Sequence, residues 1–145
     1  MLAAGHPIPQ QAARETSHIH LQPQPTAAGE ARQFVRSTAT SLDPAQLDDV
    51  LVLTSELVTN AVLHARTPLE LGVILTDDAV LVCVGDGIVT APELQESGEG
   101  QENGRGIMLV RALADDWGIL PNETRQGKVV WFLVRAADAE GGLRA

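Results

Sequence analysis

Residues 55–65 read Ser-Glu-Leu-Val-Thr-Asn-Ala-Val-Leu-His-Ala, and this stretch decides how the rest of the chain is interpreted. It predicts a largely apolar helix that carries Glu56, Asn60 and His64 at intervals of four residues. This spacing places the three polar side chains on one face of the helix. A carboxylate and a carboxamide are costly to bury without partners. They therefore either pair with other protein groups or face a cavity that holds a polar ligand, such as a nucleotide with its metal ion.

The helix is predicted to begin at Asp43-Pro44, because aspartate caps a first turn well and proline fits the first helical position. It continues to about Ala65, and Thr67-Pro68 ends it. Apolar residues fall on nearly all of its sides, so we expect it to be largely buried. A second helix is predicted over residues 27–40, with Thr26 as its N-cap.

Apolar and β-branched runs predict strands on both sides of these helices. A short strand is expected at residues 18–21. Residues 69–84 predict a hairpin that turns at Asp77-Asp78, and residues 117–134 predict another. The order of elements indicates an α+β fold: a two-layer sandwich with a mixed sheet that about three helices cover on one face.

Length and composition limit the class of protein. The 145 residues suit one domain, which we place at residues 18–135 between flexible tails at 1–17 and 136–145. A net charge of −9 argues against a protein that binds nucleic acid directly. Neither a signal peptide nor a membrane-spanning run is evident, so we expect a cytoplasmic protein without a membrane partner. Cys83 lies in an apolar run and is interpreted as a small buried hydrophobic residue.

The polar residues of the central helix suit phosphate chemistry. Asn60 offers a carbonyl oxygen, a neutral hard ligand that suits Mg²⁺. Glu56, one turn earlier, is placed to accept a proton from a hydroxyl group or water that attacks a phosphate. His64 would either orient the helix end near phosphates or form an ordinary structural hydrogen bond. The alternative for all three is a helix whose polar residues cap a neighbouring loop.

Asp86-Gly87 follows the second strand of the first hairpin. A buried carboxylate there is able to accept a hydrogen bond from the exocyclic amine of adenine, and Gly87 lets the backbone come close to a ligand. An ordinary Asp-Gly turn that ends a strand is the alternative.

A third motif, Gly104-Arg105-Gly106, follows a long polar loop at residues 88–103 that is typical of a functional lid. The motif opens a predicted helix that continues through Ile107. Free N–H groups at a helix N-terminus favour anions, and Arg105 would add charge-assisted bonds to phosphate. A glycine-rich helix start with Arg105 on the surface, in contact with a partner, explains the motif equally well.

Taken in order, these residues resemble the histidine-kinase-like ATPase domain, the Bergerat-type or GHKL superfamily that includes gyrase and MutL. The nearest branch is the anti-sigma-factor serine/threonine kinases and their actinobacterial relatives. The resemblance covers about residues 18–135 and rests mainly on Glu-Leu-Val-Thr-Asn-Ala-Val-Leu-His-Ala at 56–65, the N-box of that branch. It is supported by Asp86-Gly87 and by residues 104–110, with further agreement at 117–118 and 127–132.

The resemblance implies a Bergerat-type fold and a role for each motif. Asn60 would bind Mg²⁺ and Glu56 would act as general base. Asp86 would hold the adenine amine, while residues 104–106 would face the phosphates of ATP and residues 88–103 would form the ATP lid. The sequence departs from the family in two places. Ile88 and Thr90 replace later glycines of the first glycine box, and Lys128-Val129 stands where many members place an adenine-contacting threonine.

The resemblance also implies a function. The expected protein is an ATP–Mg²⁺-binding regulator of transcription that phosphorylates a serine or threonine of an anti-anti-sigma (STAS) partner and binds a sigma factor. Because relatives often pair, a homodimer is also considered. The alternative is a non-catalytic partner-binding module that holds a nucleotide or has lost it, which the altered glycine box favours. A stand-alone ATPase of the gyrase kind is disfavoured, since such proteins use the fold within much longer chains.

Overall fold

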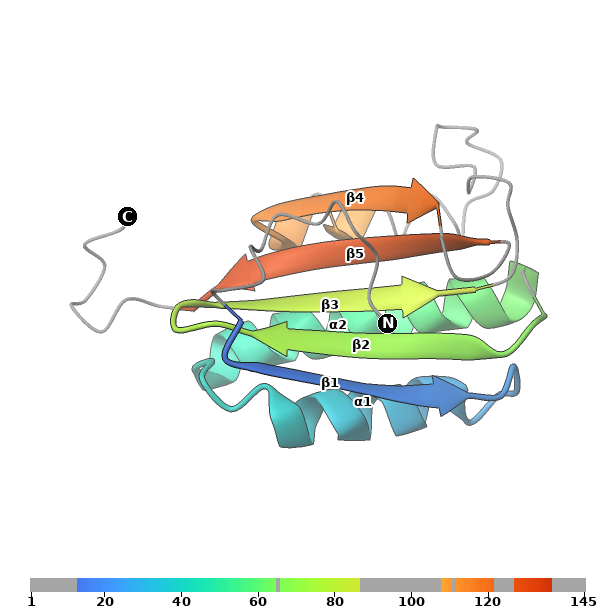
Figure 1. Ribbon diagram of the computed structural model, residues 1–145, viewed down its shortest axis with the longest axis horizontal. Coiled ribbons are helices and arrows are strands. Elements are labelled where there is room, and N and C mark those ends of the chain that lie inside the picture. The colour runs from blue at the N-terminus through green and yellow to red at the C-terminus, as the bar shows by residue number, and fades with distance from the viewer. Residues whose placement is uncertain (1–12, 65, 87–107, 111, 122–126, 137–145) are drawn as a thin grey trace.

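Five strands and two long helices make up the described part of the chain (Figure 1). The computed structural model describes residues 13–64, 66–86, 108–110, 112–121 and 127–136. Along the chain the elements are β1 (Glu15–Leu21), α1 (Ala27–Thr38), α2 (Pro44–His64), β2 (Leu69–Leu75), β3 (Ala79–Gly85), β4 (Asp116–Pro121) and β5 (Lys128–Arg135). The strands form one sheet in the order β1-β2-β3-β5-β4. The α+β class predicted from the sequence is confirmed.

Every strand pairing in this sheet is antiparallel, so the prediction of a mixed sheet is wrong in that detail. The reason lies in the connections. A single crossover helix returns the chain to the start of a parallel strand. Here both α1 and α2 lie between β1 and β2, and the additional reversal makes the two strands run in opposite directions. β2 and β3 then form a hairpin, as do β4 and β5.

The edge strand β1 begins at Glu15, three residues before the predicted strand and inside the predicted tail. Glu15 and Thr16 are exposed, so no alternation of apolar residues marks this part of the strand. Pairing with β2, where Glu15 lies opposite Leu75, is what extends it. An interaction within the sheet therefore sets the start of β1.

The boundaries of the two helices agree with the prediction more closely than the start of β1 does. Asp43 caps α2, because its Oδ1 accepts a hydrogen bond of 2.8 Å from the backbone N–H of Gln46. α1 ends at Thr38, two residues early, and Thr26 makes no side-chain cap to its backbone. Thr26 Oγ1 instead donates to Glu30 Oε2 at 3.3 Å. Helical residues also occur at 108–110 and 112–113, while the predicted helix start at 104–107 lies outside the described residues.

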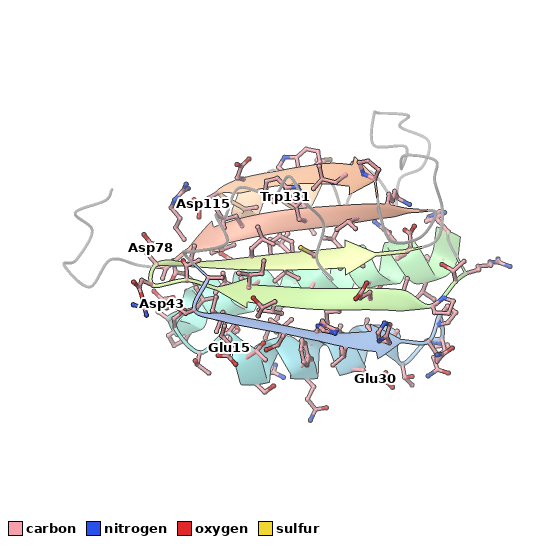
Figure 2. The ribbon with its side chains drawn as sticks, viewed as in Figure 1. Glu15, Glu30, Asp43, Asp78, Asp115 and Trp131 are labelled. Atoms are coloured by element: carbon pink, nitrogen blue, oxygen red, sulfur yellow. The ribbon has the colours of Figure 1, made fainter. Side chains whose placement is uncertain are left out.

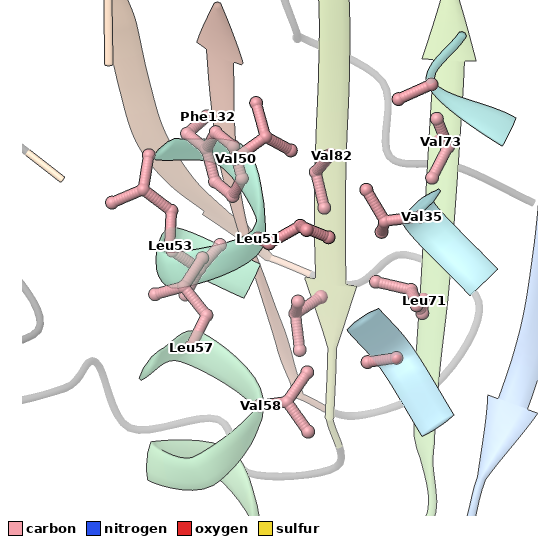
Figure 3. Packing of buried hydrophobic residues seen from close by; sticks show 14 of the residues in the cluster. Val35, Val50, Leu51, Leu53, Leu57, Val58, Leu71, Val73, Val82 and Phe132 are labelled. Carbon is pink, nitrogen blue, oxygen red and sulfur yellow. The ribbon is translucent and has the colours of Figure 1, made fainter. Parts of the chain in front are cut away.

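The main hydrophobic core lies between the two helices and one face of the sheet (Figure 3). α2 buries one side only, because in a two-layer sandwich the outer side of a helix faces solvent. Val52 and Leu63 remain exposed on that outer side, although apolar residues fall on nearly all sides of the helix. The other face of the sheet carries a second buried cluster, formed by Ile74, Ala79, Leu81, Cys83, Val129, Trp131 and Leu133. None of the helices in the described part of the chain has the length and apolar character needed to cross a membrane.

Candidate functional site

Asp86 and Lys128 lie directly opposite each other where β3 ends and β5 begins. The backbone N–H of Asp86 donates to the carbonyl oxygen of Lys128 at 2.9 Å, which continues the β3–β5 ladder by one pair. Side chains alternate between the faces of a strand. Val84 and Val130 belong to the helix-side core, so Asp86 and Lys128, two residues away on each strand, face the helices as well.

The two side chains form a buried ion pair. Lys128 Nζ lies 2.9 Å from Asp86 Oδ2, and only 11% of the lysine side chain and 4% of the aspartate side chain are exposed. Removing one partner of such a pair leaves the other charge buried without a counter-charge, which destabilises the folded state by about 3–5 kcal/mol. The carboxylate that the family resemblance assigns to adenine is therefore buried and paired with a lysine.

The contact between the start of α2 and the end of β5 fixes how far along the sheet each residue of α2 lies. Gln46 Nε2 donates to the carbonyl oxygen of Arg135 at 2.7 Å, which joins the start of α2 to the end of β5. From Arg135 back to Lys128 the strand covers about 23 Å, the length of about 15 residues of helix. Lys128 is thus level with about Asn60 on α2. Figures 1 and 3 agree, since α2 follows β3 in the same direction.

Glu56, Asn60 and His64 all lie on α2, as predicted. Glu56 and Asn60 are half-buried, and His64, the last residue of the helix, is exposed. Glu56 already has an interaction partner within the protein. Ser55, beside it, accepts a hydrogen bond from Arg32 of α1, and this contact holds the turn that carries Glu56. Glu56 and Asn60 are therefore not enclosed in packed hydrocarbon.

The remaining predicted cofactor-binding residues lie outside the described residues. They comprise Gly87, Gly104, Arg105, Gly106 and Ile107, together with the predicted lid at 88–103. Their roles stay predictions. Among the predicted site residues, the structure brings Asn60 and Asp86 to one end of the sandwich and places His64 at the exposed end of α2.

The side chains near this end of the sandwich suit a metal ion that is bound mainly by water and phosphate oxygens. Among the described residues, no three His, Cys, Asp or Glu side chains are grouped so that they could hold a metal ion. Mg²⁺ usually keeps several waters and binds substrate phosphates through one or two protein ligands. The half-buried amide of Asn60 would be able to supply one such oxygen. The donor set thus suits a magnesium ion that arrives with a nucleotide.

Negative charge gathers at the other end of the sheet. Figure 2 shows Asp43, Asp78 and Asp115 where β2 ends and β3 begins. Asp115 Oδ2 accepts a 2.6 Å hydrogen bond from the backbone N–H of Arg135, and Asp43 caps α2. These carboxylates have local structural partners and lie far from Asp86.

Sequence reasoning noted Lys128 only as a departure from the family pattern and did not place it in the site. Two signals could have identified it. Lys128 is the only lysine of the chain, and it opens the apolar run at residues 129–134. A lysine at the start of a buried strand needs a carboxylate partner. Val129, the other departure, belongs to the cluster on the opposite face of the sheet and does not face the helices.

Comparison with known proteins identifies a family. A family model described as a histidine kinase-like ATPase domain matches residues 21–134. The match begins at the last residue of β1, ends within β5, and includes α2 and Asp86. No curated protein matches the chain.

Proposed function

The chain belongs to the histidine kinase-like ATPase family, and from this premise we propose that it is a cytoplasmic serine/threonine protein kinase of the anti-sigma-factor type. Membership of the family implies that the protein binds ATP. The observation that carries the proposal is the position of Asp86, a buried carboxylate at the end of β3 that is level with Asn60 on α2. A base acceptor and a magnesium ligand at one end of the sandwich suit a bound nucleotide.

Each residue has a distinct role in binding ATP. Asp86 accepts a hydrogen bond from the exocyclic amine of adenine, and Asn60 presents its side-chain oxygen to the metal ion. When bound, Mg²⁺ neutralises negative charge on the phosphates. Arg105 and the backbone of Gly104 and Gly106 are proposed to bind phosphate oxygens, as their glycine-rich sequence suggests.

Phosphoryl transfer requires a base for the attacking hydroxyl group. Glu56 lies one helical turn before Asn60 and is half-buried, which suits a carboxylate that meets a protein substrate at the rim of the site. We propose that Glu56 takes the proton of a serine or threonine hydroxyl. The hydroxyl oxygen forms a bond to the γ-phosphorus as the bond to the β–γ bridging oxygen breaks, and ADP leaves with that electron pair.

The partner is proposed from the sequence of the N-box. Residues 56–65 resemble those of kinases that act on anti-anti-sigma (STAS) proteins and bind sigma factors. A STAS domain would accordingly be the phosphorylated partner, and a sigma factor the other partner of a switch that regulates transcription.

A second candidate is a partner-binding module without catalysis. Ile88 and Thr90 occupy positions where the family usually has glycine, and they lie in the segment next to Asp86. Side chains at these positions would restrict how the loop closes on a nucleotide. The protein would then act through protein contacts alone, with or without bound ATP.

Transfer of labelled phosphate separates the two functions. The purified protein is incubated with γ-labelled ATP, Mg²⁺ and candidate STAS proteins, and ATP binding is measured in parallel. For the kinase, the label reaches the partner, Glu56→Gln abolishes transfer while ATP still binds, and Glu15→Gln, an exposed change on β1, has no effect. ATP binding without transfer to any STAS protein would favour the binding module.

A further inference from the structure

The ammonium group of Lys128 has more hydrogen-bonding capacity than the described part of the chain uses. A lysine ammonium carries three N–H donors. Within the described part of the chain, the one hydrogen bond of Lys128 Nζ is the bond to Asp86 Oδ2, although the side chain is only 11% exposed. Buried polar groups are normally satisfied. A buried cation with donors that no described residue uses, beside the carboxylate that we propose binds the base, points to an acceptor on that base.

The pair presents an acceptor and a donor side by side. The carboxylate of Asp86 and the ammonium of Lys128 are 2.9 Å apart and face the same side of the sheet. Proteins identify bases by hydrogen bonds to their Watson–Crick edge. On adenine this edge carries the N–H donors of the exocyclic amine next to the lone pair of N1, which matches the pair.

The ion pair is expected to persist when the base binds. Displacing Lys128 from Asp86 would leave a buried cation without its counter-charge, which is strongly unfavourable. A carboxylate has about four lone-pair sites, so Asp86 is able to bond Lys128 and a base amine together. Lys128 would then remain beside Asp86 with its other N–H groups directed at the base.

We propose that Lys128 is a specificity-determining residue of the nucleotide site, whose Nζ donates to N1 of adenine while Asp86 accepts from the amine. This rests on the ATP binding of the proposed function. Guanine in the same position would place its carbonyl oxygen against the carboxylate and its N1–H against the ammonium. Both contacts would be repulsive, so Lys128 reinforces the exclusion of GTP.

The test uses 1-deaza-ATP, in which a C–H group replaces N1 and the amine is kept. Calorimetry gives the affinities of the full chain for ATP and for this analogue. Wild-type protein is expected to bind ATP about tenfold more tightly or better, the range for a hydrogen bond from a charged donor. In Lys128→Met the two affinities become equal. Lys128→Gln, which keeps N–H donors, and Arg135→Met, at the exposed far end of β5, keep the preference for ATP.

Two results would overturn the role of Lys128 without affecting the proposed function. One is equal affinity of the wild type for ATP and 1-deaza-ATP, and the other is an undiminished preference for ATP in folded Lys128→Met. If circular dichroism shows that Lys128→Met does not fold, the wild-type ratio and the ratio for Lys128→Gln decide. Wild-type protein that binds no ATP would overturn the proposed function and this inference together, so the two failures are distinguishable.

Discussion

Trp131 of β5 lies directly opposite Gly118 of β4, and its indole ring occupies the space where a side chain at Gly118 would be. A Cβ atom built on Gly118 would lie 2.9 Å from three atoms of the indole ring. Trp131 is only 7% exposed and belongs to the buried cluster on the sheet face opposite the helices. The lack of a side chain at Gly118 is therefore what allows the indole ring of Trp131 to occupy this position.

Gly118→Ala is accordingly expected to lower the free energy of unfolding by about 1–3 kcal/mol, the usual cost of overpacking. Urea unfolding followed by tryptophan fluorescence measures it. Gly29→Ala in α1 is the matched control, because its Cβ would meet Arg32 at an ordinary 3.7 Å and alanine favours a helix. That change should leave stability equal or raise it by about 0.5–1 kcal/mol. An equal loss in both variants would contradict the packing argument.

The buried pair of Asp86 and Lys128 predicts a non-additive effect on stability. Asp86→Ala is expected to destabilise the protein by about 3–5 kcal/mol, because it leaves the buried side chain of Lys128 without its counter-charge. The double variant with Lys128→Met should be considerably more stable than the sum of the single changes predicts. Urea unfolding of all four proteins in the absence of nucleotide measures the coupling.

The ion pair of Arg14 and Asp77 is the control for that cycle. It has a similar length, 2.7 Å, but both side chains are largely exposed. The hydrogen bond from Arg14 lowers the pKa of Asp77, yet solvent screens the pair and Asp77→Ala should hardly change the unfolding midpoint. If the buried pair and the exposed pair behaved alike, Lys128 would not be a true counter-charge of Asp86.

The buried thiol of Cys83 is expected to make the free energy of unfolding depend on pH in the alkaline range. Burial, with a smaller contribution from the negative charge of Glu70, raises the pKa of the Cys83 thiol from 9.0 to about 12. Above pH 9.0 the thiol ionises in the unfolded chain but keeps its proton in the folded protein. The folded state then binds more protons, so stability falls as pH rises, by up to about 1.4 kcal/mol per pH unit.

Urea unfolding at increasing pH, under reducing conditions, checks this slope. Cys83→Ala should remove the contribution of the thiol and flatten the curve, whatever it does to stability at neutral pH. The chain contains no tyrosine, which eliminates one other group that commonly titrates in this range. An unchanged slope in Cys83→Ala would show that another group causes it.

Replacing Asn60 is expected to weaken the part of ATP binding that depends on Mg²⁺. Asn60→Ala should weaken the binding of ATP by about tenfold or more in the presence of Mg²⁺ and much less without it, because one metal ligand is lost. The fold should be retained, since Asn60 is only half-buried. Thr59→Ala, the exposed neighbour on α2, is the control. Calorimetry that finds the same Mg²⁺-dependence in wild type and Asn60→Ala would show that Asn60 is not a ligand.

The sequence predicts α2 well because strong local signals mark both ends and a face of the helix. Asp43-Pro44 defines its start, and Thr67-Pro68 follows its end. Four-residue spacing correctly places Glu56 and Asn60 on the helix, and the strand ending before Asp86 is equally clear. The family match over residues 21–134 agrees with the resemblance that these residues suggest.

What the sequence does not predict depends on contacts between distant residues. The direction of β1 relative to β2 depends on the path of two helices, and the early start of β1 depends on its ladder with β2. Asp86 and Lys128 are 42 residues apart, so their pairing follows only from placing β5 beside β3. Lys128 could therefore be noticed as unusual in the sequence but not assigned a partner.

The position of the single lysine has a practical consequence for following the opening of this protein. A protease specific for lysine has one peptide bond to cleave in the chain, and that bond lies at the start of β5, within the ladder. Proteolysis requires local or global opening of the segment that is cut. One fragment pair would thus report how often the start of β5 opens, and a bound nucleotide should slow its appearance.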